Sequence, residues 1–308
     1  MRRLLSVFLV ILGFSIVFSI TLINPLGPAV IPVVAITEGK VKGAVHLNVE
    51  IWKNPEEAIA MIASKKADFY VLPITVGANL YLKGMDIVLL GVHEWNVFYM
   101  VISEDETFSN WKDLVGKEIY TAHGRGQTVD VLMRYLMTEE GVIPDKDVRI
   151  LYAPPQEIVA LFKSGKIKFA ALPEPFVTLC ALGGKGKIAL DFQKVWGDKM
   201  GIPPRLPIAG LFTSRRFLKE YPMVVEKVVE LFKNSVEWMN KNLDEALVLT
   251  KKFLNIPTPV LKESMKRTKF YYVDIKDCEG EVALFLKKLN ELYPEGMPGV
   301  PDEGFYAR

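Results

Sequence analysis

The sequence is poor in the residues that build metal sites and disulfide frameworks. It has two cysteines and three histidines among 308 residues. The histidines (His46, His93 and His123) follow no metal-ligand spacing, and neither an HExxH motif nor a paired-cysteine ligand set is present. No Ser/His/Asp set suggests a nucleophile with its base. We therefore expect no metal site, no cofactor and no catalytic residues.

The sequence also lacks an excess of charge of either sign. Lysine and arginine total 38 against 36 aspartate and glutamate, so the formal net charge is only +2. A strongly basic face of the kind that binds nucleic acid is not indicated, and we expect no nucleic-acid partner. With 308 residues the chain is long enough for two domains that each bury a core.

Long hydrophobic runs are absent except at the N-terminus. Arg2 and Arg3 precede the almost wholly apolar stretch Leu4–Ile20. This is a signal-peptide pattern, and we expect residues 1–19 to be removed by cleavage after Ser19. The alternative is an uncleaved anchor, because the run is close to the minimum length of a spanning helix. Either way, the body of the protein is expected in the periplasm or outside the cell.

An internal repeat occurs at an offset of one hundred residues. Residues 55–73 (PEEAIAMIASKKADFYVLP) and 155–173 (PQEIVALFKSGKIKFAALP) share eight of nineteen positions. Each copy fits a helix followed by a short apolar strand, and a further strand precedes it. Continuous apolar strands suit a parallel sheet that is covered on both faces. The repeat therefore predicts two α/β lobes built on one plan, rather than two unrelated units with the same α/β pattern.

The order of the remaining segments suggests where the chain passes between the lobes. Residues 97–102 (VFYMVI) fit a first crossing, and Ile208–Thr213, after a proline-rich link, fits the return. We expect lobe one to comprise 20–102 plus 207–308 and lobe two 103–206. Each lobe is expected to hold a mostly parallel sheet flanked by helices, with two crossover strands as the hinge. Cys180 and Cys278 then fall in different lobes, so we expect two buried thiols rather than a disulfide.

Four segments carry a resemblance to a known family: 111–136 (WKDLVGKEIYTAHGRGQTVDVLMRYL), 67–80 (ADFYVLPITVGANL), 172–179 (LPEPFVTL) and 213–225 (TSRRFLKEYPMVV). The chain resembles the nitrate/sulfonate/taurine group of periplasmic binding proteins, which includes binders of thiamine-precursor pyrimidines. The resemblance implies the two-lobed type II periplasmic-binding-protein fold and delivery of a solute to an ABC-transporter permease. The first loop (NPLGPAVIP), with Leu26 and Gly27, lacks the polar or aromatic residues many members have there.

The loop of Gly124, Arg125, Gly126, Gln127 and Thr128 is the strongest candidate for ligand binding. A glycine loop that opens a helix exposes backbone N–H groups beside the positive end of the helix dipole. Such a loop can hold a carboxylate, a sulfonate, a phosphate or a polar ring edge. The alternative is an ordinary tight turn with Thr128 as the helix N-cap.

Further candidates lie at the ends of other strands. They are Leu26 and Gly27 in the first loop, Trp52, the helix start Ile74–Thr75–Val76, Trp95 with Asn96, and Glu174 with Phe176. The tryptophans could stack on a flat solute, and Glu174 could accept from an amine or an aminopyrimidine. Packing for the aromatics, and a helix-terminal carboxylate for Glu174, are the alternatives.

These observations predict an exported, monomeric solute-binding protein. It would capture a small polar or anionic organic molecule, of sulfonate, nitrate, taurine or aminopyrimidine type, and deliver it to an ABC importer. One alternative is an enzyme of pyrimidine or thiamine-precursor metabolism on the same fold. Another is a ligand-sensing domain of a membrane receptor.

Overall fold

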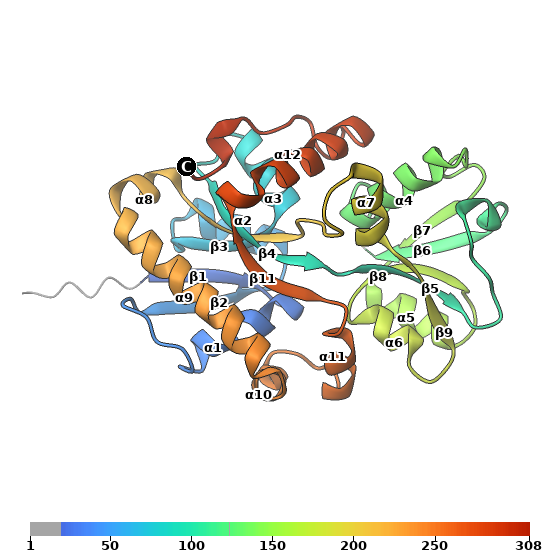
Figure 1. Cartoon of the computed structure of the whole chain (residues 1–308), viewed down its shortest axis with the longest axis horizontal. Helices are drawn as coiled ribbons and strands as arrows, with labels where there is room; N and C mark the ends of the chain where they lie inside the picture. The colour runs from blue at the N-terminus through green and yellow to red at the C-terminus, as the bar shows by residue number, and fades with distance from the viewer. Residues whose placement is uncertain (1–19, 123) are drawn as a thin grey trace, which may run out of the picture.

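The computed structural model describes residues 20–122 and 124–308 as two α/β lobes joined side by side (Figure 1). The expected signal segment, residues 1–19, and His123 lie outside the described residues. The two-lobed α/β architecture that the sequence predicts is confirmed. Across the described ranges, no helix has the length and apolarity needed to cross a membrane.

The first lobe is built on a six-stranded mixed sheet. Its order is β11-β4-β10-β3-β1-β2. The strands are β1 (Ile20–Pro25), β2 (Leu47–Trp52), β3 (Phe69–Pro73), β4 (Val88–Asn96), β10 (Ala209–Thr213) and β11 (Lys269–Asp274). Strands β2, β1 and β3 are parallel, whereas β10 is antiparallel to β3 and β4, and β11 is antiparallel to β4.

The second lobe repeats this plan with five strands. They are β5 (Phe98–Ser103), β6 (Glu118–Ala122), β7 (Arg149–Ala153), β8 (Phe169–Pro173) and β9 (Gly186–Asp191), in the order β7-β6-β8-β5-β9. Here β7, β6 and β8 are parallel, and β5 is antiparallel to β8 and β9. Both sheets are therefore mixed, but most strands of each run in one direction, as the prediction of mostly parallel sheets requires. The crossing strands β5 and β10 are among the exceptions, because each enters its sheet against the direction of the parallel strands.

The sequence repeat corresponds to equivalent units of the two sheets. Helix α2 (Pro55–Ala63) leads into β3 of the first sheet, and α5 (Pro155–Lys163) leads into β8 of the second. Asn54 caps α2 by accepting from the Glu57 N–H, while the Glu57 carboxylate accepts from the Lys53 N–H. Both helices begin with a proline. Proline suits this position because the N–H that it lacks would have no partner within the helix. The predicted common plan of the lobes is confirmed.

The remaining helices cover the faces of the sheets or follow strands at the carboxyl ends. The longest is α9 (Pro222–Lys241), which turns Val225, Val228, Phe232 and Val236 inward at helical spacing. The others are η1 (Pro28–Val33), α1 (Val34–Thr37), α3 (Ile74–Leu82), η2 (Trp111–Leu114), α4 (Thr128–Glu139), α6 (Phe176–Ala181), α7 (Phe192–Met200), α8 (Arg215–Glu220), α10 (Leu243–Leu249), η3 (Thr250–Lys252), α11 (Thr258–Ser264), α12 (Ile275–Leu292) and η4 (Glu303–Phe305).

The chain crosses between the sheets twice. The first crossing is at Val97, between β4 and β5, and the second is the segment that leads into β10. The two crossings are hydrogen-bonded to each other, because Leu206 N–H donates to Trp95 O (3.0 Å) and Ile208 N–H to Glu94 O (2.9 Å). Strand β5 pairs with β8 and β9, so residues 98–102 belong with the second sheet and not with lobe one as expected. The apolar run VFYMVI pairs within the second sheet because the chain crosses between the lobes at its first residue, Val97.

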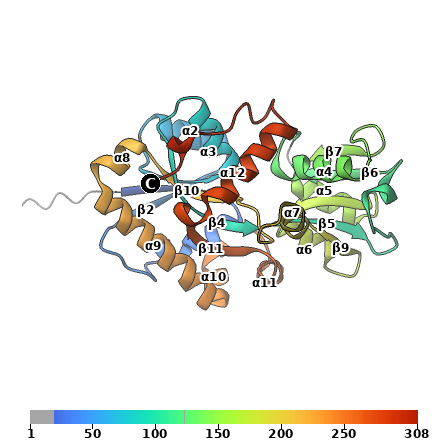
Figure 2. The ribbon, with the colours of Figure 1, turned by 45° about the horizontal axis from the view of Figure 1, so that its top comes forward.

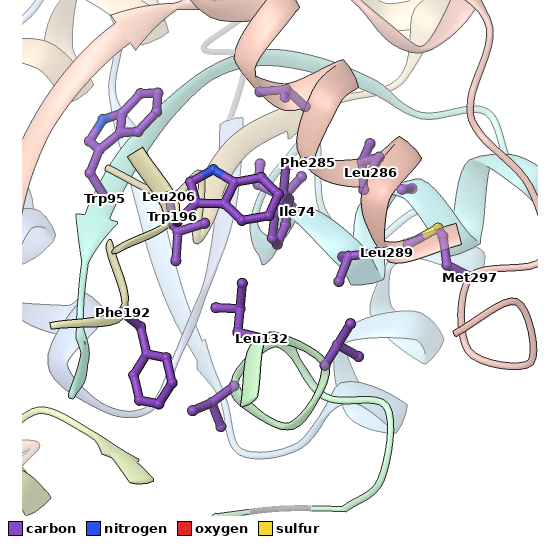
Figure 3. Close-up of a cluster of buried hydrophobic side chains, with 14 of the residues drawn as sticks. Ile74, Trp95, Leu132, Phe192, Trp196, Leu206, Phe285, Leu286, Leu289 and Met297 are labelled. Carbon is purple, nitrogen blue, oxygen red and sulfur yellow. The ribbon is translucent and has the colours of Figure 1, made fainter. Parts of the chain in front are cut away.

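Helices of the first lobe also contact the second lobe on both sides of the crossing. In both views α12 lies on one side of the crossing strands and α11 on the other (Figure 2). Beside α12, the rings of Trp196 and Phe285 meet edge to face with their centroids 6.0 Å apart. Figure 3 shows Leu132 of α4 pointing toward Ile74 and Leu289 of the first lobe. One apolar cluster therefore continues from one lobe into the other.

The two cysteines are both free and buried, as the sequence predicts. Cys180 lies in α6 and Cys278 in α12. Burial raises the pKa of each thiol to about 12, so both are protonated at neutral pH and are inert as nucleophiles.

Candidate functional site

A cavity of about 180 Å³ lies where the start of α3 in the first lobe faces the loop before α4 in the second. Five of the residues singled out from the sequence line it: Thr75, Val76, Arg125, Gly126 and Gln127. The other lining residues are Asn79, Val131, Leu289, Tyr293, Gly296 and Met297.

Two helix N-termini, one from each lobe, border this cavity. Pro73 precedes α3 and Gln127 precedes α4, and neither side chain caps its helix. The first-turn N–H groups of a helix lack partners within the helix and carry a partial positive charge. Thr75 and Val76 are in that first turn of α3, and Gln127 is the capping position of α4. The cavity therefore lies beside hydrogen-bond donors from both lobes.

The Gly126 amide, however, is already used within the protein. Its N–H donates to Oδ2 of Asp130 at 2.7 Å. Oδ1 of the same carboxylate accepts from Arg134 Nε at 2.9 Å and from the Tyr152 hydroxyl at 2.8 Å. Asp130 is fully buried in the first turn of α4, where a negative charge complements the helix dipole. The loop is thus held in place by its own helix, and the Gly126 amide is not free to donate to a solute.

Arg125 is paired with an acidic side chain. Its guanidinium lies 3.0 Å from Oδ2 of Asp145, and Arg134 binds the same oxygen at 2.7 Å. The two arginines hold the pKa of the Asp145 carboxyl below its usual range, chiefly through the hydrogen bond from Arg134. Arg125 remains more than half exposed at the cavity rim, where it adds a partly compensated positive charge.

Tyr293 covers the cavity from the first lobe. Its ring lies directly over Gly126, because a Cβ on that glycine would be 1.8 Å from Tyr293 Cε1. Gly126 has φ of +83°, a conformation that suits glycine. Beside the ring, Asn79 Nδ2 donates to Gly296 O at 2.9 Å. Within residues 20–122 and 124–308, the hydroxyls of Thr75 and Tyr293 have no hydrogen-bond partner, so both can serve a solute.

Gly124, Thr128, Leu26 and Gly27 lie outside the cavity lining. Gly124 is exposed and its carbonyl accepts from the Gln127 N–H, and Thr128 is the first residue of α4. Leu26 is 44% exposed in the loop after β1, and its N–H donates to Trp52 O at 2.7 Å. Gly27 precedes η1 with φ of +145°. Their role in binding stays a prediction.

The tryptophans predicted to stack on a solute are covered by protein. Trp95 is fully buried and stacks on Tyr271, while the Arg205 guanidinium lies 4.2 Å from its ring centroid. Its Nε1 donates to Tyr271 O, so little of the ring is left for a ligand. Trp52 and Ile74 are buried in the apolar cluster that joins the lobes. Asn96, next to Trp95, donates to Pro204 O at 3.3 Å.

Glu174 is engaged in a contact between the lobes. Its Oε1 accepts from Arg267 Nε at 2.6 Å, and its Oε2 accepts from the Thr178 N–H and hydroxyl. Arg267 also donates to the Thr178 hydroxyl at 2.6 Å. With its carboxylate almost wholly buried and bonded, Glu174 has no free oxygen directed at a solute. Phe176, at the start of α6, is half-buried.

Sequence reasoning missed the part of the cavity that comes from the C-terminal region. Leu289, Tyr293, Gly296 and Met297 follow one another at the end of α12 and in the loop after it. The aromatic and glycine pair Tyr293 and Gly296 offered a signal, but no local pattern tells which loop a distant ring will contact. Asn79 could have been found, because it lies one helical turn after Thr75 and Val76 on the same helix.

Metal ligands are not gathered in this structure. Over residues 20–122 and 124–308, no group of three or more His, Cys, Asp or Glu side chains is placed to hold a metal ion. The cavity lining within the same ranges contains Arg125 but no carboxylate. The arrangement therefore suits a neutral or anionic polar molecule better than a cation.

Comparisons with known proteins agree with this architecture. The sequence model of the NMT1-like family matches residues 58–250, which is more than half of the chain. No curated protein matches the sequence. Many solved structures match the fold, at low sequence identity.

Three of these structures cover nearly the whole chain. An ABC transporter protein from Parabacteroides distasonis has a TM-score of 0.77 at 20% identity, covering 94% of this chain and 99% of that one. The periplasmic aliphatic sulphonate binding protein SsuA from Escherichia coli has 0.74 at 15%, covering 94% and 92%. The alkanesulfonate-binding protein SsuA from Xanthomonas axonopodis pv. citri, bound to MOPS, has 0.69 at 14%, covering 94% and 98%. At such identities the matches establish the fold.

Proposed function

Since this chain belongs to the NMT1-like family, we propose that it is a solute-binding protein of an ABC importer. It captures a small polar organic molecule between its two lobes and delivers it to the membrane permease. The N-terminal pattern of Arg2, Arg3 and Leu4–Ile20 supports export, so the protein acts in the periplasm or outside the cell. It works as a monomer with respect to the solute, because both walls of the cavity come from one chain.

One observation carries this proposal: the cavity is shared between the lobes. Thr75 and Val76 reach it from the first lobe, and Arg125, Gly126 and Gln127 reach it from the second. A molecule bound there contacts both lobes at once and so favours the form in which they are together. Two crossings that are hydrogen-bonded to each other provide the hinge for such closure.

The lining chemistry supports a neutral or anionic solute. The free hydroxyl of Thr75, the side chain of Gln127 and the helix starts offer donors, and Arg125 adds positive charge at the rim. Two of the matching structures are named as sulphonate or alkanesulfonate binders. Small aliphatic sulfonates are therefore the first probes, followed by nitrate, taurine and aminopyrimidines.

The test is to identify what the protein holds and then to weaken the contact. Native mass spectrometry of protein purified without refolding should show a bound small molecule, and isothermal titration should give its affinity. We expect Gln127→Ala to weaken that affinity about tenfold, or about 1.4 kcal/mol. Gln156→Ala, an exposed glutamine on α5, is the matched control and should bind as the wild type does. Wild-type affinity in Gln127→Ala would place the solute elsewhere.

A further inference from the structure

The ring of Tyr293 occupies a slot whose two walls are glycines. A Cβ on Gly126 would lie 1.8 Å from Tyr293 Cε1, and a Cβ on Gly296 would lie 2.1 Å from the same atom. Neither approach is sterically possible, so the ring can stay in this position only while both residues lack a side chain. Other glycines that the structure describes have no ring so close to them: a Cβ on Gly141 would meet nothing within 4 Å.

The two glycines belong to different lobes. Gly296 is in the same loop as Tyr293, and its N–H donates to Tyr293 O at 3.1 Å, while Tyr293 N–H donates to Leu289 O at 2.8 Å. Tyr293 is therefore fixed on the first lobe by the end of α12. Gly126 precedes α4 on the second lobe, where Asp130 fixes its amide. The ring can touch Gly126 only when the lobes are together.

We propose that Tyr293 is a latch between the lobes that closes the solute cavity. This inference rests on the proposed function and adds the residue that couples closure to the cavity. When the lobes meet, the ring seats against Gly126 and completes one wall of the cavity beside Thr75 and Gln127. Its hydroxyl, which has no partner among the described residues, is then available to the enclosed solute. When the lobes separate, the ring leaves Gly126 and opens the cavity.

A double-mutant cycle tests the latch without any solute. Gly126→Ala adds both a clash with the ring and backbone strain from the positive φ. In the Tyr293→Ala background only the strain remains. We expect Gly126→Ala to lower Tm less in that background than in the wild type, by at least about 2 °C. Equal losses in the two backgrounds would mean that ring and glycine do not meet in solution, and the latch would be rejected.

Gly141→Ala is the matched control for this cycle. Gly141 lies on the same lobe as Gly126 and has φ of +76°, close to the +83° of Gly126, but it has open space around it. Its effect on Tm should therefore be the same with and without Tyr293→Ala. If Gly141→Ala showed the same coupling as Gly126→Ala, the coupling would be a general effect of the Tyr293 change, and the latch would again be rejected.

A second measurement covers the case in which Gly126→Ala does not fold. Hydrogen exchange of the amides at residues 127–133 should be faster in Tyr293→Ala than in the wild type, because the start of α4 loses its cover. Unchanged exchange there would overturn the latch. Neither experiment depends on a solute, so failure of the latch leaves solute capture standing. Conversely, protein that binds no small molecule can still show the coupling.

Discussion

Two adjacent residues of β4, His93 and Glu94, place ionisable groups inside the first lobe. The His93 ring lies between Phe232 and Phe270, and both of its nitrogens are buried without a partner among the described residues. Burial lowers the pKa of His93 to about 3 and raises the pKa of Glu94 to about 7. His93 is therefore neutral at physiological pH, whereas Glu94 titrates close to it. Their effects on stability oppose each other as pH changes.

Glu94→Gln should remove a loss of stability at neutral pH. The folded protein holds the Glu94 proton more tightly than the unfolded chain does, so protonated Glu94 adds to the free energy of unfolding. This addition is complete below about pH 4.5, falls as pH rises toward 7 and is lost above pH 7. The whole loss is about 3 kcal/mol. Glutamine has nearly the same shape and does not titrate. We expect the free energy of unfolding of the variant, measured by urea unfolding, to rise steadily relative to that of the wild type between pH 4.5 and 7.5.

A constant difference between Glu94→Gln and the wild type over that range would show that the Glu94 pKa is not raised. His93 serves as a control, because its effect on stability has the opposite pH dependence. Since its folded pKa is lowered, the stability that His93 contributes is lost as pH falls below about 6.5 and not as it rises. The two residues can therefore be told apart by the direction in which each changes the pH profile.

At the scale of single elements, the start of α4 shows how a buried carboxylate fixes a glycine loop. Its glycines allow the turn, but the buried carboxylate of Asp130 fixes it by accepting from Gly126, Arg134 and Tyr152. The loop is therefore fixed by hydrogen bonds within the protein. For the proposed solute site, such a fixed loop means less entropy to lose on binding.

Asp130→Ala should destabilise the protein by about 2–3 kcal/mol, because the Gly126 amide and the Tyr152 hydroxyl lose their buried acceptor, whereas Arg134 keeps its hydrogen bonds to Asp145. Asp145→Asn, which removes the charge of a carboxylate that is 42% exposed and keeps a residue type that tolerates the φ of +65°, should cost less than about 1 kcal/mol. Urea unfolding of both variants measures the contrast. Similar losses for the two would mean that the buried network does not hold the loop.

Elements that depend on local pattern could be predicted from the sequence. Helices α2 and α5 and the strands after them follow from apolar spacing, an asparagine cap and the prolines at their starts. The mixed order of the sheets could not be predicted, because the pairing of β10 with β3 and β4 joins segments more than one hundred residues apart. Local pattern also placed β5 in the wrong lobe, since an apolar strand fits either sheet equally well.

The candidate site was predictable to a similar extent. The helix starts near Thr75 and Gln127 could be predicted, because glycines, prolines and the ends of strands precede them in the sequence. Their partners could not, because Tyr293 reaches Gly126 and Arg267 reaches Glu174 only through tertiary packing. Trp95 looked available to a solute for the same reason: Tyr271 and Arg205, which cover it, lie far along the chain.

At the scale of the whole molecule, closure involves contacts on both sides of the hinge. Trp196 meets Phe285 on the side of α12, and Glu174 binds Arg267 on the side of α11. Gly126 and Tyr293 meet at the cavity itself. The lobes are thus joined by an apolar contact, an ion pair and a latch. A solute that reinforces the last of these shifts the population toward the closed form.

Small-angle scattering with and without solute tests the central claim most directly. The protein is stripped of bound small molecules, and its radius of gyration is compared with that at saturation with the molecule that native mass spectrometry identifies. We predict a smaller mean radius when the solute is bound, because the solute raises the fraction of molecules with closed lobes above the fraction that is already closed without it. An unchanged radius at a saturation confirmed by titration would contradict capture by lobe closure.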